Sequence, residues 1–133
     1  MADSKYIVID PENKNNLGDI NISPAVLEVL LGIAASKVSG VSEMRGTLAD
    51  SILGREKRSK GVTVSYDEKT GKLTADVYVY LKYGVSVPQV ALEMQKDLTQ
   101  QLQYMTEMEM AQVNVHVVGL VTPKTDKQVA NSK

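Results

Sequence analysis

The sequence contains no cysteine and only one histidine, His116. The lack of cysteine excludes disulfide bonds, zinc sites built on thiolates and cysteine nucleophiles, and nothing indicates export to an oxidising compartment. A single histidine cannot form the paired-histidine motif of zinc proteases. The chain also lacks a GxxxxGK phosphate loop and a GxGxxG motif after a strand. We therefore predict no catalytic residue, no metal site and no cofactor.

Phenylalanine and tryptophan are also missing, so the six tyrosines are the only aromatic residues. The core must be built from aliphatic residues and methionine, which argues against a deep aromatic-lined cofactor pocket. The longest apolar run, Val29 to Ala35, is too short to cross a bilayer. The first residues do not have the build of a signal peptide. We expect a cytoplasmic protein that reaches a membrane only through a partner.

Neither sign of charge dominates, since 15 basic residues stand against 16 acidic ones. A domain that binds nucleic acid over much of its surface is usually basic, so the charge balance argues against that function. A chain of 133 residues is long enough for one domain and too short for two full cores. We therefore predict a single domain.

Hydrophobic periodicity predicts elements in the order β-α-β-β-α-β. Serine marks both helix starts, because Ser23 precedes Pro24 and Ser86 stands three positions before Gln89. Between the two middle strands, the residues up to Gly71 have the composition of a hairpin loop. The predicted elements are strand 19–22, helix 24–38, strands 62–66 and 73–83, helix 87–107 and strand 113–117.

The simplest arrangement that buries both helices is a two-layer α+β domain, with two helices packed on one face of a small mixed sheet. Apolar residues cover well over half the circumference of the first helix, so we expect it to be largely buried. A right-handed crossover places strand 19–22 beside strand 73–83. We expect residues 18–121 to form the domain, 1–17 a flexible arm that adds a strand at an edge, and 122–133 a disordered tail.

Residues 39–61 are punctuated by four glycines and are interpreted as a surface loop. Basic side chains gather between the last two glycines, and we predict that they form a loop that binds a partner or an anion. The anion could belong to an acidic protein surface, to lipid head groups or to nucleic acid. A solvated loop without a ligand is the alternative. The residues are Arg55, Lys57, Arg58 and Lys60.

Strand 73–83 alternates between apolar and polar residues, so one of its faces belongs to the core and the other is open. Tyrosine on the open side favours self-association or the docking of a partner, and valine-rich strands could leave an edge for pairing. A solvated face is the alternative. We predict an interaction face made of Tyr78, Tyr80, Lys82 and His116, beside Thr63, Ser65, Asn114 and Val118.

Three segments together resemble a known family. They are ISPAVLEVLLGIAASKVSGVSEM, SILGREKRSKGV and VYVYLKYGVSVPQVALEMQKDLTQQLQYMTEMEMAQVNVHVVGL. The family is that of the alkaline shock and general stress proteins, which are envelope stress response proteins of Gram-positive bacteria. The match covers about residues 17–121, and the pieces YGVSVP, VNVHVVG and IAASKVSGV are the most specific.

The resemblance implies a non-enzymatic cytoplasmic protein that associates with itself. Some members are held beneath the membrane by a small membrane-anchored protein and serve cell-envelope homeostasis. Others are linked to fatty-acid precursor synthesis through neighbouring acetyl-CoA carboxylase genes. The family has no agreed catalytic residues, so none is carried over. This chain is similar to the short single-domain members, which leaves the lipid-synthesis branch open.

The leading hypothesis is an envelope stress response protein that acts by self-association and protein–protein interaction. A regulator of fatty-acid precursor synthesis and a weak RNA-binding module are alternatives, and an enzyme with an unrecognised site would require His116. The salt dependence of binding distinguishes RNA binding from a tyrosine-based interface. Binding to several phosphates weakens by orders of magnitude between about 50 and 200 mM salt, whereas a tyrosine- and valine-based interface should hardly respond.

Overall fold

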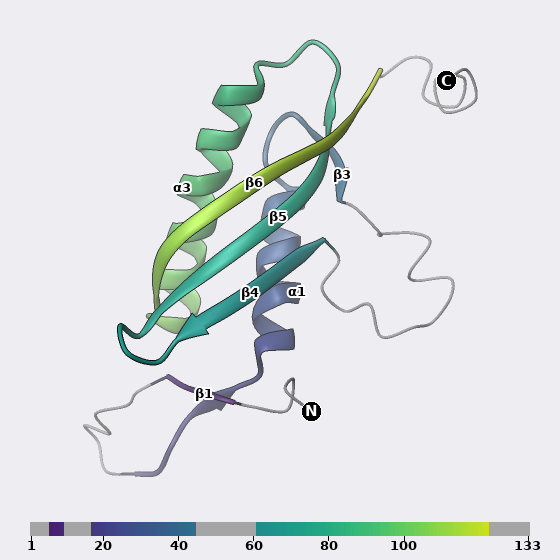
Figure 1. Cartoon of the computed structure of the whole chain (residues 1–133). Coiled ribbons are helices and arrows are strands. Elements are labelled where there is room, and N and C mark those ends of the chain that lie inside the picture. Colours follow the sequence, from purple (N-terminus) through teal and green to yellow (C-terminus); the bar gives the residue numbers. More distant parts are fainter. Residues whose placement is uncertain (1–5, 10–16, 45–60, 123–133) are drawn as a thin grey trace, which may run out of the picture.

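The computed structural model describes residues 6–9, 17–44 and 61–122. It confirms an α+β domain in which two helices pack on one face of a mixed sheet. In the view of Figure 1 the strands lie in front of both helices, so the reader looks onto the uncovered face of the sheet. The predicted basic loop with Arg55, Lys57, Arg58 and Lys60, and the tail after Thr122, lie outside the described residues.

The sheet is organised around the long central strand β5, Lys72–Lys82. Strand β6, Glu109–Val121, runs parallel to β5 and pairs with it from end to end. Strands β3, Val41–Met44, and β4, Val62–Asp67, both pair antiparallel with β5. Because β3 pairs with residues 79–81 and β4 with residues 72–77, the two follow one another along the same edge of β5. The sheet is therefore three strands wide.

The helices begin where serine and proline predict. Helix α1, Pro24–Ser36, has Ser23 as its N-cap, and the Ser23 hydroxyl accepts a hydrogen bond from the Ala25 amide. Helix α3, Val87–Thr106, has Ser86 as its N-cap in the same way. Helix α1 packs against β3 and β4, while α3 packs against β6. Both helices thus cover the same face of the sheet, α1 beneath the β3 and β4 edge and α3 beneath the β6 edge.

One side of β5 supplies the centre of the core. All five of its inward side chains are fully buried, and they alternate with half-buried ones on the other face. Buried positions of α3 recur at intervals of four residues, so one stripe of the helix meets the sheet. The inward set of β5 is Leu73, Ala75, Val77, Val79 and Leu81, and that of α3 is Val90, Met94, Leu98 and Leu102.

The expected strand order is wrong for the first strand. Residues Asn21–Ile22 form β2, which pairs with β1, Ile7–Val8, in a separate two-stranded sheet and not with β5. The arm therefore does contribute a strand, although its partner is β2. The neighbour that lies parallel to β5 is β6, and the connection between them is α3. The rule that crossovers are right-handed does not say whether β2 or β6 becomes the parallel neighbour of β5, so the sequence alone could not decide between them.

Two other expectations are corrected. Val41–Met44 is strand β3 and not part of a surface loop, because its short Val-Ser-Glu-Met run completes the edge of β5 that β4 leaves open. Helix α1 is less buried than predicted, since Val26 and Ile33 are 50% and 53% exposed. A sheet three strands wide covers only one side of a helix, so the rest of the apolar stripe meets solvent.

Substitution at Gly40 should distinguish a steric clash from backbone strain. Gly40 and Gly84 have φ of 101° and 100°, but only at Gly40 would a Cβ atom lie 2.7 Å from Val90 Cγ2. Strain alone should make Gly84→Ala cost about 1 kcal/mol, whereas the clash should raise the cost of Gly40→Ala to about 2–3 kcal/mol. Urea unfolding of both variants measures the difference, and equal costs would contradict it.

Candidate functional site

The uncovered face of β5 and β6 carries a polar and aromatic cluster. We call it the open face. The register of the parallel pair places Asp76 beside Asn114, Tyr78 beside His116 and Tyr80 beside Gly119. On the other side of β5, Thr63 lies beside Asp76 and Ser65 beside Thr74. The open face consists of Thr63, Ser65, Thr74, Asp76, Tyr78, Tyr80, Asn114 and His116.

Asp76 is the centre of the hydrogen bonds on this face. Its Oδ1 atom accepts a hydrogen bond from Asn114 Nδ2 at 3.1 Å and one from His116 Nε2 at 3.1 Å. An ionised carboxylate only accepts, so this contact requires the proton of His116 to be on Nε2. Gln112 Nε2 extends the network by donating to Asn114 Oδ1 at 3.4 Å. Side chains of β6 thus hold Asp76 in place.

These contacts change the electrostatics of the carboxyl group. The hydrogen bond from His116 is the main cause that lowers the pKa of Asp76 below its ordinary value of 3.8, and the bond from Asn114 lowers it further. Partial burial of the carboxyl group opposes this change in pKa. Asp76 therefore carries its negative charge throughout the neutral and mildly acidic range.

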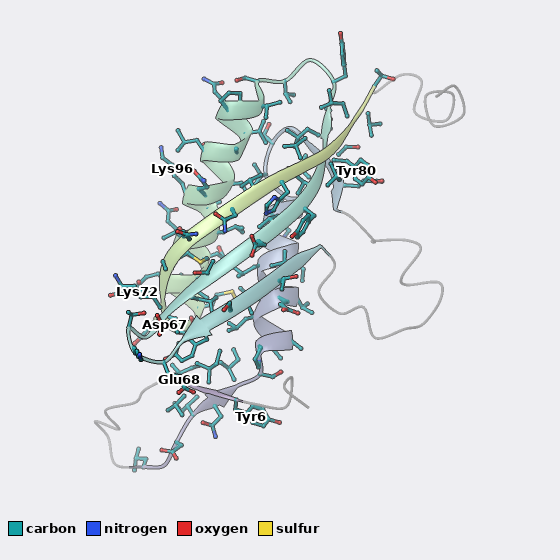
Figure 2. The ribbon with its side chains drawn as sticks, viewed as in Figure 1. Tyr6, Asp67, Glu68, Lys72, Tyr80 and Lys96 are labelled. Carbon is teal, nitrogen blue, oxygen red and sulfur yellow. The ribbon has the colours of Figure 1, made fainter. Side chains whose placement is uncertain are left out.

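Two aromatic contacts complete the cluster. The rings of Tyr78 and His116 stack with their centroids 4.5 Å apart and their planes 13° from parallel. The ring of Tyr80 lies directly over Gly119, because a Cβ atom at that glycine would approach two ring carbons to 2.8 Å. A one-residue shift in register between Val117 and Gly119 brings the glycine opposite Tyr80. Figure 2 shows Tyr80 at the end of the sheet near β3.

The structure brings most of the predicted interaction face together. Tyr78 and His116 touch, and Tyr80 lies on the same face one residue pair further along β5. Lys82 is exposed at the end of β5, opposite Val121, and no contact joins it to the cluster in the described residues. Whether any of these residues binds a partner stays a prediction.

Sequence reasoning missed the role of Asp76. Alternation along strand 73–83 places Asp76 on the open side, but nothing local indicates that residues 114 and 116 lie beside it. Sequence reasoning also missed Gly119. The absence of a side chain at Gly119 leaves the space that the Tyr80 ring occupies. The signal for both lies in the register between β5 and β6, which joins segments separated by a whole helix.

A second surface lies between the helices. Helices α1 and α3 enclose an open groove of about 740 Å³ with a mainly apolar lining, in which Val26, Ile33 and Met105 are half-exposed. Lys37 and Asp97 are the charged residues of its lining. The sequence signal for this groove is the wide apolar stripe on helix 24–38. From the sequence that stripe predicted a buried helix, whereas in the structure part of it lines the groove.

The described residues contain neither a cluster of metal ligands nor a helix that could span a bilayer. Ranges 6–9, 17–44 and 61–122 contain no cluster of three or more histidine or acidic residues that could hold a metal ion. Within the same ranges, no helix combines the length and the apolar character that spanning a bilayer requires.

Comparison with known proteins identifies the family. A sequence profile for the alkaline shock protein 23 family, which has a cell envelope-related function, matches residues 12–122. The chain belongs to this family. The resemblance to the alkaline shock proteins is therefore confirmed, and no solved structure matches the chain significantly.

Relatives in the alkaline shock protein family include proteins of similar length. The chain is 40% identical to protein YqhY of Bacillus subtilis over 123 residues, covering 90% of this chain and 89% of YqhY. It is 41% identical to protein Spy1535 of Streptococcus pyogenes over 111 residues, covering 84% and 85% of the two chains. A stress response regulator gls24 homolog of Streptococcus pyogenes is 25% identical over 109 residues, which are 79% of this chain and 60% of that protein.

The ranking of the contacts to Asp76 can be measured directly. Titration of the Asp76 carboxyl carbon by NMR should give a pKa below 3.8 in the unaltered chain. His116→Ala should raise this pKa more than Asn114→Ala does, because the bond from His116 is the larger cause. A larger rise in Asn114→Ala would contradict the ranking.

The pKa of Asp76 also predicts how stability depends on pH. Because the folded-state pKa lies below the unfolded-state value, ionised Asp76 stabilises the fold above the unfolded-state value, and this contribution disappears as the pH falls through the folded-state pKa. The unaltered chain should exceed Asp76→Asn in unfolding free energy by less than about 1 kcal/mol at pH 7, since the side chain is 35% exposed. The difference should shrink below about pH 3.8, and a constant difference would refute the linkage.

Proposed function

We propose that the protein serves the cell-envelope stress response by binding other proteins, including copies of itself, through the open face. The observation that carries the proposal is the ordered cluster around Asp76, Tyr78 and His116. A membrane-anchored protein is the further partner that we propose. The family's cell envelope-related function and the stress regulators among its distant relatives support this setting.

The physical state of the open face favours binding over simple solvation. Side chains on a solvated sheet face are usually free to rotate, and a binding partner must then immobilise them at a cost of about 0.5–1.5 kcal/mol each. Here the Asp76 carboxyl group and the rings of Tyr78 and His116 are already fixed by contacts within the domain. A partner would therefore meet a preorganised surface.

The chemistry of the face also suits a protein partner. Tyrosine is enriched where protein interfaces carry most of their binding energy, because it offers a large apolar ring with a polar end. Tyr78 and Tyr80 are both half-buried, so part of each ring remains accessible. His116 is held between the Asp76 carboxylate and the Tyr78 ring, so its own ring helps to fix the shape of the face. We therefore propose a binding role and not catalysis for this histidine.

Light scattering on the purified protein tests the proposal. We expect an oligomer whose molar mass is the same at low and high salt, since stacking and apolar contacts respond little to ionic strength. Tyr78→Ala/Tyr80→Ala should weaken association at least about tenfold, because two central aromatic residues are removed.

A matched control removes two tyrosines elsewhere. Tyr83→Ala/Tyr104→Ala changes residues that are 65% and 83% exposed and are not part of the open face, so it should associate like the unaltered chain. Circular dichroism confirms that each variant is folded. A monomer under every condition would refute self-association, and equal weakening in both double variants would refute the open face as its location.

A further inference from the structure

The outer edge of β6 carries backbone groups that point away from the sheet. The Tyr78 amide donates to the Gly61 carbonyl at 2.8 Å, so even-numbered residues of β5 direct their backbone groups toward β4. Odd-numbered residues of β5 then face β6, and in a parallel pair they bond to the residues on either side of their partners. It follows that Asn114 and His116 face β5, while Val115 and Val117 face outward.

A side chain of α3 confirms this direction. Gln95 Nε2 donates to the Val113 carbonyl at 3.0 Å, so that oxygen lies on the side of the strand that β5 does not occupy. After the register shift the alternation resumes, because the Tyr83 amide donates to the Val121 carbonyl and Leu120 is left facing outward. In the described part of the chain, no hydrogen bond reaches the outward backbone groups of Val115, Val117 or Leu120.

The edge also lacks the residues that usually protect an exposed strand. Natural edge strands avoid pairing with other chains by carrying proline, lysine or other charged residues, by β-bulges, or by being short. Register shifts beside Thr74 and Tyr80 leave Gln112 to Val117 as the regular stretch of β6. Strand β6 has 13 residues, and from Met110 to Val121 it contains no proline, lysine, arginine, aspartate or glutamate. Among the described residues, Gln95 is the one whose side chain donates a hydrogen bond to this edge, and it reaches the Val113 carbonyl.

The helix layer extends beyond the sheet at this edge. Helix α3 packs on β6, and α1 packs on β3 and β4, so the helices lie beneath the outer strands. Two packed helices about 9 Å apart, each about 10–12 Å across, occupy a layer about 20 Å wide. Three strands at about 4.8 Å spacing cover about 14 Å, so helices centred beneath the outer strands extend about 3 Å past the sheet at each edge.

We infer that β6 accepts one extended strand from a partner protein, laid along its outer edge and over α3. The partner is an extended segment in which apolar and polar residues alternate, because its inward side chains would lie on the α3 side of the sheet, where Gln95 reaches the Val113 carbonyl. Leu120 of β6 is 48% exposed, so apolar surface is available beside the outward backbone groups. This inference goes beyond the proposed function, which concerns the open face, and either one holds without the other.

A second folded copy does not fit in this position. Pairing β6 with β6 of another copy would bring the two α3 helices to about the spacing of neighbouring strands, roughly 4.8 Å, whereas packed helices need about 8–10 Å. An extended segment carries no helix beneath it and meets no such obstacle. The position of α3 beneath β6 thus favours a single extended strand over an edge-to-edge dimer.

Hydrogen exchange tests whether the edge is free. In the isolated full-length chain, the amides of Val115, Val117 and Leu120 should exchange at least about tenfold faster than those of Asn114 and His116, which face β5. Adding a synthetic peptide of alternating valine and threonine with lysine at both ends should slow exchange of the three outward amides. A peptide with two valines replaced by proline is the control and should have no effect, since proline cannot donate to the ladder.

Three variants connect peptide binding to the edge. Val115→Pro removes an outward N–H group that no internal ladder uses, and should weaken binding of the peptide at least about tenfold. Leu120→Lys places a charge at the edge and should weaken it similarly. Ile33→Lys is the matched control, because Ile33 is 53% exposed but lies on α1, away from β6, and it should bind like the unaltered chain.

Several results would overturn the inference. Slow exchange of the outward amides in the isolated chain would mean that the edge is already occupied. Peptide binding that persists in both Val115→Pro and Leu120→Lys, or that perturbs Tyr78 in place of β6, would place the peptide elsewhere. Dissociation of a native oligomer by Val115→Pro would make the edge a self-interface. A failure of the open-face proposal would be seen separately in light scattering, as a molar mass of the Tyr78→Ala/Tyr80→Ala variant that equals that of the unaltered chain.

Discussion

The alternation of side chains along strand β5 fixes which face of the sheet belongs to the core and which face is open. The inward side chains of β5 are completely buried against the helices, so a shift of one residue would expose all of them. The same constraint orients Asp76, Tyr78 and Tyr80 to the other side. Core stability and the composition of the open face therefore depend on a single register.

The helices influence the sheet edges as well as the core. Glu28 of α1 accepts a hydrogen bond from the Val64 amide at one edge, and Gln95 of α3 donates to the Val113 carbonyl at the other. Each helix thus satisfies one backbone group of an outer strand. Because α3 lies beneath β6, an extended chain would fit along this edge more easily than a second copy with its own helix.

The two proposed surfaces would use different physics. The open face offers fixed side chains, whose stacking and hydrogen bonds reduce the entropy that binding must remove. The edge of β6 offers backbone groups, which recognise an extended conformation more than a particular sequence. His116 lies on β6 with its side chain on the open face, so a strand added at the edge would lie next to the cluster.

Local sequence patterns were enough to predict the two helices with their serine caps, the hairpin strands and the two-sided character of β5. Periods of two and of about 3.6 residues and helix capping depend on residues that are close in the chain. The sequence also indicated the family through its motifs. Three features could be seen only in the folded chain. Strand β6 and not Asn21–Ile22 lies parallel to β5, Val41–Met44 forms a strand, and Asp76 contacts Asn114 and His116. These contacts join distant segments, and their register depends on which faces can be buried together, so no local pattern encodes them.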